Sequence, residues 1–248
     1  MSDRKIALVT GALGGIGSEI CRSLIAAGYK VIATVVPRDT SREADWLAKE
    51  GIRAEDVRFV HCNLADHDAA HAAIAEAIAA EGRIDVLVNN AGITRDAVFK
   101  KMTFEQWSQV LDVNLKTLYT VTQPVFLKML EQGSGRIISI SSVNGLKGQF
   151  GQANYSAAKA GMIGFSKALA QEGARSGITV NVIAPGYTAT PMVTAMREDV
   201  VKSIEDQIPL KRLAAPAEIA AAVMYLVSDA AAYITGETLS VNGGLYMQ

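Results

Sequence analysis

The sequence has 248 residues, 24 Lys and Arg against 25 Asp and Glu, and 50% hydrophobic residues. A chain of this length buries roughly 70–75% of the surface that its unfolded form exposes, so it needs no disulfide or metal to fold. Because the charges are balanced and dispersed, we expect neither a nucleic acid nor an anionic membrane as a partner.

Several features predict a cytoplasmic location. The longest apolar runs fall far short of the roughly 18–20 residues that cross a bilayer. The N-terminus passes directly into a strand-like segment, without the h-region or cleavage site of a signal peptide. Cys21 and Cys62 lie far apart and in no C-x-x-C pair, so we interpret them as buried small apolar residues, as reducing conditions favour.

Short β-branched runs alternate along the chain with longer segments of helical period, which is the pattern of repeated βαβ units and a parallel sheet. The predicted strands are residues 6–10, 30–36, 57–62, 85–89, 135–141, 179–184 and 238–241. The predicted helices are residues 16–27, 41–50, 66–81, 103–131, 154–176 and 216–228. Gly28 and Gly82 stand where left-handed C-caps end the first and third helices.

The sequence predicts a single domain over residues 1–248, since no Pro- or Ser-rich linker and no shift in composition divides it. Residues 187–213 follow Pro185-Gly186 and mix charged, apolar and Met residues without a strand. We interpret this segment as a helical insertion that closes over a pocket as a lid.

A glycine-rich turn joins the first strand to the first helix. It reads Thr10-Gly11-Ala-Leu-Gly-Gly15-Ile16-Gly17. Glycines at such a turn let the backbone approach a pyrophosphate, and the helix N-terminus supplies free N–H groups. The turn lacks the Gly-Lys-[Ser/Thr] ending of a P-loop, and its spacing differs from G-x-G-x-x-G.

This turn resembles the cofactor turn of the short-chain dehydrogenase/reductase family, and three further stretches match in the expected order over essentially the whole chain. They are Asn89-Asn90-Ala91-Gly92, Ser142 with Tyr155-x-x-x-Lys159, and Pro185-Gly186. The resemblance implies an α/β fold of the Rossmann type, with a doubly wound, parallel, seven-stranded sheet in one domain. It also implies a nicotinamide cofactor and a homotetramer.

The resemblance assigns the cofactor to residues at the carboxyl ends of the strands. They are Gly11, Gly15, Ile16, Gly17, Asn63, Leu64, Asn90, Ala91, Gly92, Tyr155, Lys159, Pro185 and Gly186. The family often has Asp at the position of Asn63, and an amide there can still accept and donate hydrogen bonds.

The end of the second strand decides between NAD and NADP. It carries no carboxylate that would bond a ribose 2′-OH and repel a 2′-phosphate, whereas Arg38 and Arg42 follow closely. A guanidinium suits phosphate, so we predict NADPH/NADP⁺. Two observations oppose this: Asp39 could present its carboxylate there, and Gly14 stands where many NADP-dependent relatives have Arg. The alternative is that both arginines are solvated charges at a helix start.

The predicted catalytic group is Ser142, Tyr155, Lys159 and Asn114. Lys159 follows Tyr155 by four residues, which places both side chains on one helix face. A free phenol has a pKa near about 10, and a nearby ammonium is expected to lower it. Ser142 would hydrogen-bond the substrate carbonyl oxygen. The resemblance adds that Lys159 binds the nicotinamide ribose and that Asn114 holds a proton-relay water; the alternative for Asn114 is a mid-helix amide that needs only a backbone partner.

No metal site or hydrolase site is predicted. The sequence contains no G-x-S-x-G elbow. His67 and His71 have helical spacing but lack the H-E-x-x-H pattern, so we interpret them as part of a solvated helix face.

Residues 141–155 resemble a subgroup of the family, the acetoacetyl-CoA reductases of polyhydroxyalkanoate biosynthesis, with the 3-oxoacyl-acyl-carrier-protein reductases of fatty acid biosynthesis close by. The resemblance implies reduction of acetoacetyl-CoA to (R)-3-hydroxybutyryl-CoA by NADPH. It places Gln149, Phe150, Gln152 and Tyr187 around the substrate, as two amides for the polar arm and two aromatic walls. The alternative for Phe150 is ordinary core packing.

The thioester carrier, CoA or acyl carrier protein, stays an alternative. Carrier-protein reductases place basic residues before the fifth and sixth strands, to meet an acidic partner. Here those places carry Glu131-Gln-Gly-Ser134 and Arg175-Ser176-Gly177, with Lys128 and Arg136 nearby, which favours CoA. A noncatalytic dinucleotide-binding protein is the remaining alternative, and the presence of all four predicted catalytic residues opposes it.

Overall fold

The computed structural model describes residues 4–37 and 41–247. The seven strands are β1 (Ile6–Thr10), β2 (Lys30–Val35), β3 (Val57–His61), β4 (Val86–Asn89), β5 (Gly135–Ile140), β6 (Ile178–Pro185) and β7 (Thr238–Val241). They form one sheet in the order β3-β2-β1-β4-β5-β6-β7, and every neighbouring pair is parallel. The predicted α/β fold with a doubly wound, parallel, seven-stranded sheet is therefore confirmed.

The principal helices alternate with the strands along the chain. They are α1 (Gly15–Ala26), α2 (Ser41–Glu50), α3 (His67–Glu81), α4 (Phe104–Leu111), α5 (Thr117–Gln132), α6 (Val143–Lys147), α7 (Ala153–Gly173), α8 (Pro191–Thr194), α9 (Glu198–Gln207) and α10 (Pro216–Val227). Short 3-10 turns cover Ala54–Asp56, Phe99–Lys101, Ala174–Ser176 and Asp229–Ala231.

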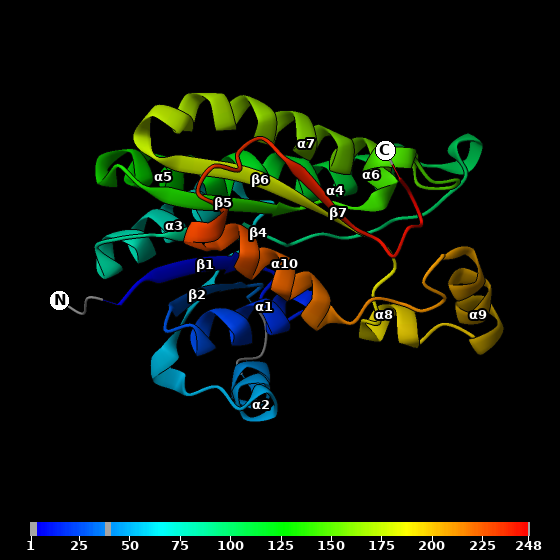
Figure 1. The fold of residues 1–248 in the computed structure, drawn as a ribbon, viewed down its shortest axis with the longest axis horizontal. Coiled ribbons are helices and arrows are strands. Elements are labelled where there is room, and N and C mark those ends of the chain that lie inside the picture. The colour runs from blue at the N-terminus through cyan, green and yellow to red at the C-terminus, as the bar shows by residue number, and fades with distance from the viewer. Residues whose placement is uncertain (1–3, 38–40, 248) are drawn as a thin grey trace.

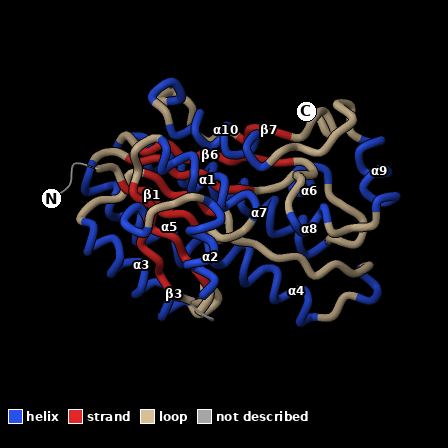
Figure 2. The backbone as a smooth tube through the Cα atoms, turned by 90° about the horizontal axis from the view of Figure 1, so that it is seen from below, coloured by secondary structure: helices blue, strands red, loops and turns tan. Residues whose placement is uncertain are grey.

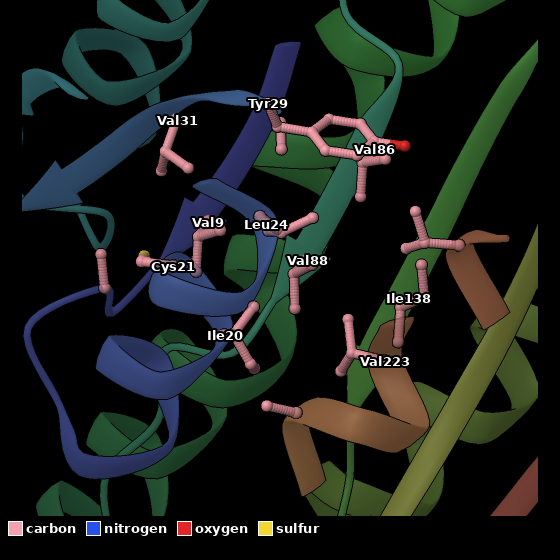
Figure 3. Packing of buried hydrophobic residues seen from close by; sticks show 14 of the residues in the cluster. Val9, Ile20, Cys21, Leu24, Tyr29, Val31, Val86, Val88, Ile138 and Val223 are labelled. Atoms are coloured by element: carbon pink, nitrogen blue, oxygen red, sulfur yellow. The ribbon is translucent and has the colours of Figure 1, made fainter. Parts of the chain in front are cut away.

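Helices cover both faces of the sheet (Figure 1). On one face, α1 and α10 pack against β1, β4 and β5 through Ile20, Leu24 and Val223, all fully buried (Figure 3). On the other, α3 and α5 pack through Ile74, Val125 and their neighbours. The strands β1, β2, β4, β5 and β6 carry long apolar runs because helices exclude water from both of their faces. The edge strand β3 does not, since its Arg58 and His61 are exposed.

The predicted helix over 103–131 divides into three parts. A Thr103 capping box opens α4, a π-helical turn occupies Asp112–Lys116, and α5 follows. A single-turn π segment inside a helix frequently marks a functional site. The sequence did not indicate α6, which is short and glycine-containing. Gly82 caps α3 at φ 77°, as predicted, and the Asp66 side chain caps its start.

The segment 187–213 is helical, as predicted, and carries α8 and α9. Its two ends are joined, since the Ala214 N–H donates to the Tyr187 carbonyl at 2.9 Å and the Ala189 N–H to the Ala214 carbonyl at 2.8 Å. From this base α8 and α9 extend past the carboxyl ends of the strands (Figures 1 and 2). Across the described residues, the search for a helix long and apolar enough to span a bilayer finds none.

Candidate active site

The site lies where the strand order reverses, between β1 and β4. In open α/β sheets the crevice beyond the carboxyl ends of the strands at this point is where ligands bind. Asn90, directly after β4, fixes the glycine turn of β1: its amide nitrogen donates to the Thr10 and Gly11 carbonyls at 3.0 and 3.1 Å. The Thr10 hydroxyl in turn accepts from the backbone N–H groups of Asn90 and Ala91, both at 2.9 Å.

The glycine turn needs its glycines for space. A Cβ on Gly17 would overlap the Gly11 carbonyl oxygen, and a Cβ on Gly11 would stand 3.0 Å from the Ala91 Cα. Gly11 also has φ 63°, in the left-handed region that glycine tolerates. These two glycines therefore allow the close approach of β1, α1 and the loop after β4.

A groove of about 630 Å³ runs along this turn. The predicted cofactor residues that line it are Gly11, Gly15, Ile16, Gly17, Arg42, Leu64, Asn90, Ala91 and Gly92. At its floor α1 begins at Gly15, and Gly14 provides no side-chain cap for the N–H groups of the first turn. An uncapped helix start beside a groove is suited to a phosphate group. The residues present thus fit a dinucleotide.

Of the two arginines predicted to bind the 2′-phosphate, the structure describes only Arg42. Arg42 is exposed and lines the groove beside Val36 and Glu43. Glu43 is engaged by the His61 ring nitrogen. Arg38, with Asp39, lies outside the described residues.

At the adenine end predicted from the resemblance, Leu64 lines the groove whereas Asn63 does not. The Asn63 carboxamide oxygen instead accepts the Ala65 N–H at 3.2 Å. Cys62, which the sequence analysis treated as a packing residue, is 5% exposed and also lines the groove. Burial raises the pKa of the Cys62 thiol to about 11.

A second cavity of about 300 Å³ continues from the groove, sharing Ile16, Asn90, Gly92 and Thr190 with it. This cavity contains the predicted catalytic side chains Ser142, Tyr155 and Lys159 and the predicted residues Gln152, Pro185, Gly186 and Tyr187. Segments far apart in the sequence therefore meet at one place. The groove and the cavity together form one continuous crevice.

Tyr155 and Lys159 lie one helical turn apart at the start of α7. The Lys159 Nζ stands 5.6 Å from the Tyr155 ring centre and donates a 2.7 Å hydrogen bond to the Ile140 carbonyl at the end of β5. Burial lowers the pKa of Lys159 to about 8. Burial also raises the pKa of Tyr155, although a hydrogen bond with Ser142 opposes this rise. Burial therefore sets the direction of the Tyr155 pKa shift, and the lowering expected from Lys159 stays a prediction.

Ser142 follows β5 and caps α6, and its hydroxyl accepts the Asn144 N–H at 3.1 Å. Its neighbour Ser141 is buried and donates to the Lys159 carbonyl at 2.8 Å. These two serines tie the end of β5 to α6 and α7, and so hold the hydroxyl of Ser142 beside Tyr155.

Asn114 is fully buried in the π-helical turn. Its side chain closes a reciprocal pair with the backbone of Ile93: its oxygen accepts the Ile93 N–H at 2.8 Å, and its nitrogen donates to the Ile93 carbonyl at 2.9 Å. The structural alternative of an amide satisfied by backbone is thus present. A Cβ placed on Gly92 would stand 3.4 Å from the Asn114 oxygen and 3.5 Å from the Lys159 Nζ, so Asn114 also lies near the catalytic lysine.

The predicted substrate residues divide into two pairs. Gln152 and Tyr187 line the cavity, and Gln152 is held by Asp96 at 2.8 Å and by Asn144 at 2.9 Å. Gln149 and Phe150 line neither the groove nor the cavity of the described chain. Phe150 is 86% exposed, which makes the core-packing alternative wrong.

The sequence analysis missed several residues of the crevice. Asp96, Asn144, Thr190, Val193 and Met196 all line the cavity. Val193 and Met196 come from the segment 187–213, whose role as a lid stays a prediction. No local motif marks any of these positions, and only the position of Asp96 shortly after the Asn89–Gly92 stretch could have indicated it.

The basic positions considered for a carrier protein lie at the other edge of the sheet. Arg136 is the second residue of β5 and Arg175 precedes β6, whereas the cavity lies at the carboxyl ends of these strands. Arg136 also turns onto the Gly135 carbonyl at 3.1 Å, and Lys128 pairs with Glu131 at 3.1 Å. A carrier protein bound at these positions would therefore lie far from the cavity of the same chain.

The histidine pair is engaged with α5. The His67 Nδ1 lies 2.9 Å from the Thr120 hydroxyl, and the His71 Nε2 lies 2.9 Å from the Gln123 side-chain oxygen. Within the described parts of the chain, no three His, Cys, Asp or Glu side chains gather as a metal site.

Comparison with known proteins gives consistent matches. A family model described as short chain dehydrogenase matches residues 5–201. The chain is 79% identical to the acetoacetyl-CoA reductase of Acinetobacter sp. (strain RA3849), over 100% of both chains. It is 49% identical to the acetoacetyl-CoA reductase of Cupriavidus necator, over 98% of this chain and 99% of the relative. It is 47% identical to the 3-oxoacyl-[acyl-carrier-protein] reductase of Salmonella typhimurium, over 98% of each chain.

Proposed function

The chain belongs to the short-chain dehydrogenase family, and on that premise we propose that it is a reductase of a short 3-oxoacyl thioester, most specifically acetoacetyl-CoA. One observation carries the proposal. The hydroxyl groups of Ser142 and Tyr155 and the ammonium of Lys159 meet in a cavity that continues into the glycine-lined groove. Among relatives, the 79% identical protein named acetoacetyl-CoA reductase supports the choice of substrate.

The side chains of the cavity have separate roles in ketone reduction. When bound, a reduced nicotinamide supplies the hydride to the 3-keto carbon. Ser142 donates a hydrogen bond to the ketone oxygen, where negative charge develops, and thereby stabilises the transition state. Tyr155 donates the proton that this oxygen needs. Because burial raises the pKa of Tyr155, the phenol stays protonated near neutral pH and is available as the acid.

Lys159, whose Nζ lies over the Tyr155 ring, supports the proton transfer. Its ammonium favours the phenolate that forms when Tyr155 loses its proton. The hydrogen bond to the Ile140 carbonyl fixes the ammonium in place. Asn114 is proposed to act with it by anchoring the π-helical turn beside the lysine, where a relay water could bind. The product is then a 3-hydroxyacyl thioester, which by the family resemblance has the (R) configuration.

For the cofactor we propose NADPH. Gly11, Gly15, Ile16 and Gly17 would hold the pyrophosphate, and Asn90, Ala91, Gly92, Pro185 and Gly186 would surround the nicotinamide half. The absence of a carboxylate at the end of β2 and the position of Arg42 in the groove support a 2′-phosphate. Arg38 belongs to the same proposal. The cytoplasmic location and the homotetramer are further proposals that rest on the sequence and on the family resemblance.

The choice of CoA over acyl carrier protein is tested by kinetics. We would measure kcat/KM for acetoacetyl-CoA and for acetoacetyl-acyl-carrier-protein, each with NADPH and with NADH, in one buffer. Our proposal expects the highest value for acetoacetyl-CoA with NADPH. Preference for the carrier-protein thioester would assign the chain to fatty acid biosynthesis, as the 47% identical relative allows. Preference for NADH would remove the arginines from the cofactor site.

A further inference from the structure

An aromatic pocket of about 320 Å³ lies on the surface where the loop after β4 enters α4. It is lined by Phe99, Met102, Thr103, Phe104 and Trp107. Phe99 and Phe104 are 74% and 82% exposed. Isolated exposed apolar residues are ordinary, but a hollow lined by three aromatic rings is typical of a binding site. Neither the core nor the proposed reaction uses these rings.

Lysines accompany the aromatic residues. Lys100 and Lys101 share the 3-10 turn with Phe99, both are exposed, and among the described residues neither has a hydrogen bond or ion pair from its side chain. The nearest acidic residues in sequence are already engaged: Asp96 accepts from Gln152, and Glu105 accepts from Gln109. These carboxylates are therefore turned to other partners, and the ammonium groups of Lys100 and Lys101 stay open to an anion beside the pocket.

The loop that carries the pocket also lines the catalytic cavity. Asp96 lines that cavity and precedes Phe99 by three residues. Between them, the Ala97 N–H donates to the Gly151 carbonyl at 2.9 Å, which joins this loop to the turn that carries Phe150. The loop and α6 lie at the same end of the sheet (Figure 1). A long substrate that enters the cavity can thus continue onto the aromatic surface.

We propose that this pocket binds the adenine of a CoA thioester, and that Lys100 and Lys101 bind its phosphate groups. The inference rests on the proposed function and names how that substrate is held. A purine stacks on aromatic rings, and the pyrophosphate and 3′-phosphate of CoA carry the negative charge that two free lysines complement. The pocket volume is at the low end of the roughly 300–1,000 Å³ usual for small ligands.

The same assignment distinguishes the two thioester carriers. A carrier protein presents its pantetheine arm without a nucleotide, so it would leave the aromatic pocket unused. Contacts to the distant nucleotide hold substrate and transition state equally. They therefore lower KM for acetoacetyl-CoA and leave kcat unchanged.

The test compares acetoacetyl-CoA with acetoacetyl-N-acetylcysteamine, which keeps the reacting end but lacks the nucleotide. Phe104→Ala should lower kcat/KM for acetoacetyl-CoA about fivefold or more, through KM, and leave the truncated thioester unaffected. Replacing Lys100 and Lys101 together by Ala should lower kcat/KM for acetoacetyl-CoA about two- to fivefold at low salt. In 1 M salt this decrease in kcat/KM should be smaller, because salt screens the charges. Tyr233→Ala, which removes an exposed ring elsewhere, is the matched control and should change neither substrate.

A binding measurement gives a second readout. Trp107 lines the pocket, so adenosine 3′,5′-bisphosphate should change its fluorescence while saturating NADP⁺ occupies the cofactor site. Phe104→Ala should weaken this response about fivefold or more. The inference is overturned if Phe104→Ala lowers kcat/KM equally for both thioesters or for neither, including the case in which it changes only the oligomeric state. If the wild type does not reduce acetoacetyl-CoA at all, the proposed function fails instead.

Discussion

The Lys159 ammonium lies 5.6 Å from the centre of the Tyr155 ring and is held there by the Ile140 carbonyl at 2.7 Å. The last residue of β5 thus positions the lysine over the ring of Tyr155. Desolvation by burial is the largest cause of the pKa shift of each side chain. The pKa of Lys159 falls to about 8, and the pKa of Tyr155 rises.

Tyr155→Phe should remove the proton donor without disturbing the fold. We expect kcat for ketone reduction to fall by about 10²–10⁴-fold, which is the usual contribution of a positioned acid. Affinity for NADPH, measured by fluorescence titration, should change little because the ring remains. Tyr233→Phe is the control, since Tyr233 is fully exposed. A Tyr155→Phe enzyme with nearly the wild-type kcat would show that another group supplies the proton.

Lys159→Met should change how stability depends on pH. The folded pKa of Lys159 is about 8, whereas an unfolded lysine has about 10.4. Between these values the unfolded chain binds more protons than the folded chain, so the free energy of unfolding rises with pH. Below pH 8 the cost of burying the ammonium is fully present, and the curve for this group is flat.

We would therefore measure urea unfolding of both proteins from pH 7 to pH 10, without cofactor. The wild type should gain stability over Lys159→Met above pH 8, by at most about 1.4 kcal/mol per pH unit. Lys202→Met, at an exposed position in α9, should follow the wild type. Parallel curves for wild type and Lys159→Met would mean that the lysine keeps its ordinary pKa in the folded chain.

The sheet was predictable because its strands are buried on both faces. A strand shielded by helices needs an unbroken apolar run, and such a run predicts Ile6–Thr10 with its observed bounds. The π-helical turn was not predictable. Its residues continue the helical pattern of 103–131, and the bonds of Asn114 are made with Ile93, 21 residues away.

The candidate site was predictable where motifs carry it. Tyr155, Lys159 and Ser142 meet in the cavity as expected, because their spacing is fixed by one helix and by the end of β5. The direction of the Tyr155 pKa shift was not predictable, since the burial of a side chain depends on the folded chain as a whole. Phe150 shows the same limit: its glycine neighbours indicate a turn but not whether the ring points to core, cavity or solvent.

Arg42→Ala should weaken the binding of NADPH more than the binding of NADH. If the guanidinium binds the 2′-phosphate, its loss removes charge-assisted hydrogen bonds that only NADPH makes. Because Arg42 is exposed, we expect a modest rise in KM for NADPH, about five- to tenfold, with KM for NADH nearly unchanged. Arg175→Ala removes an exposed arginine far from the groove and should affect neither cofactor. Equal effects of Arg42→Ala on both cofactors would remove Arg42 from phosphate recognition.

Gly17→Ala should damage the glycine turn through sterics alone. Gly17 is buried, and a Cβ there would overlap the Gly11 carbonyl oxygen and stand 2.9 Å from the Asn90 amide nitrogen. Both neighbours are fixed, because the same Asn90 nitrogen bonds the Thr10 and Gly11 carbonyls. The turn must then move, at a cost of about 1–3 kcal/mol.

Gly14→Ala is the matched control in the same turn. Its Cβ would meet only the Gly11 oxygen, at 3.4 Å, and its φ of -79° suits any residue. We expect Gly17→Ala to lower Tm by several degrees and to abolish measurable NADPH binding, whereas Gly14→Ala should keep the wild-type Tm. Calorimetry and fluorescence titration would measure both effects. If Gly17→Ala bound NADPH like the wild type, the close approach of the turn to Asn90 would not be needed for the cofactor site.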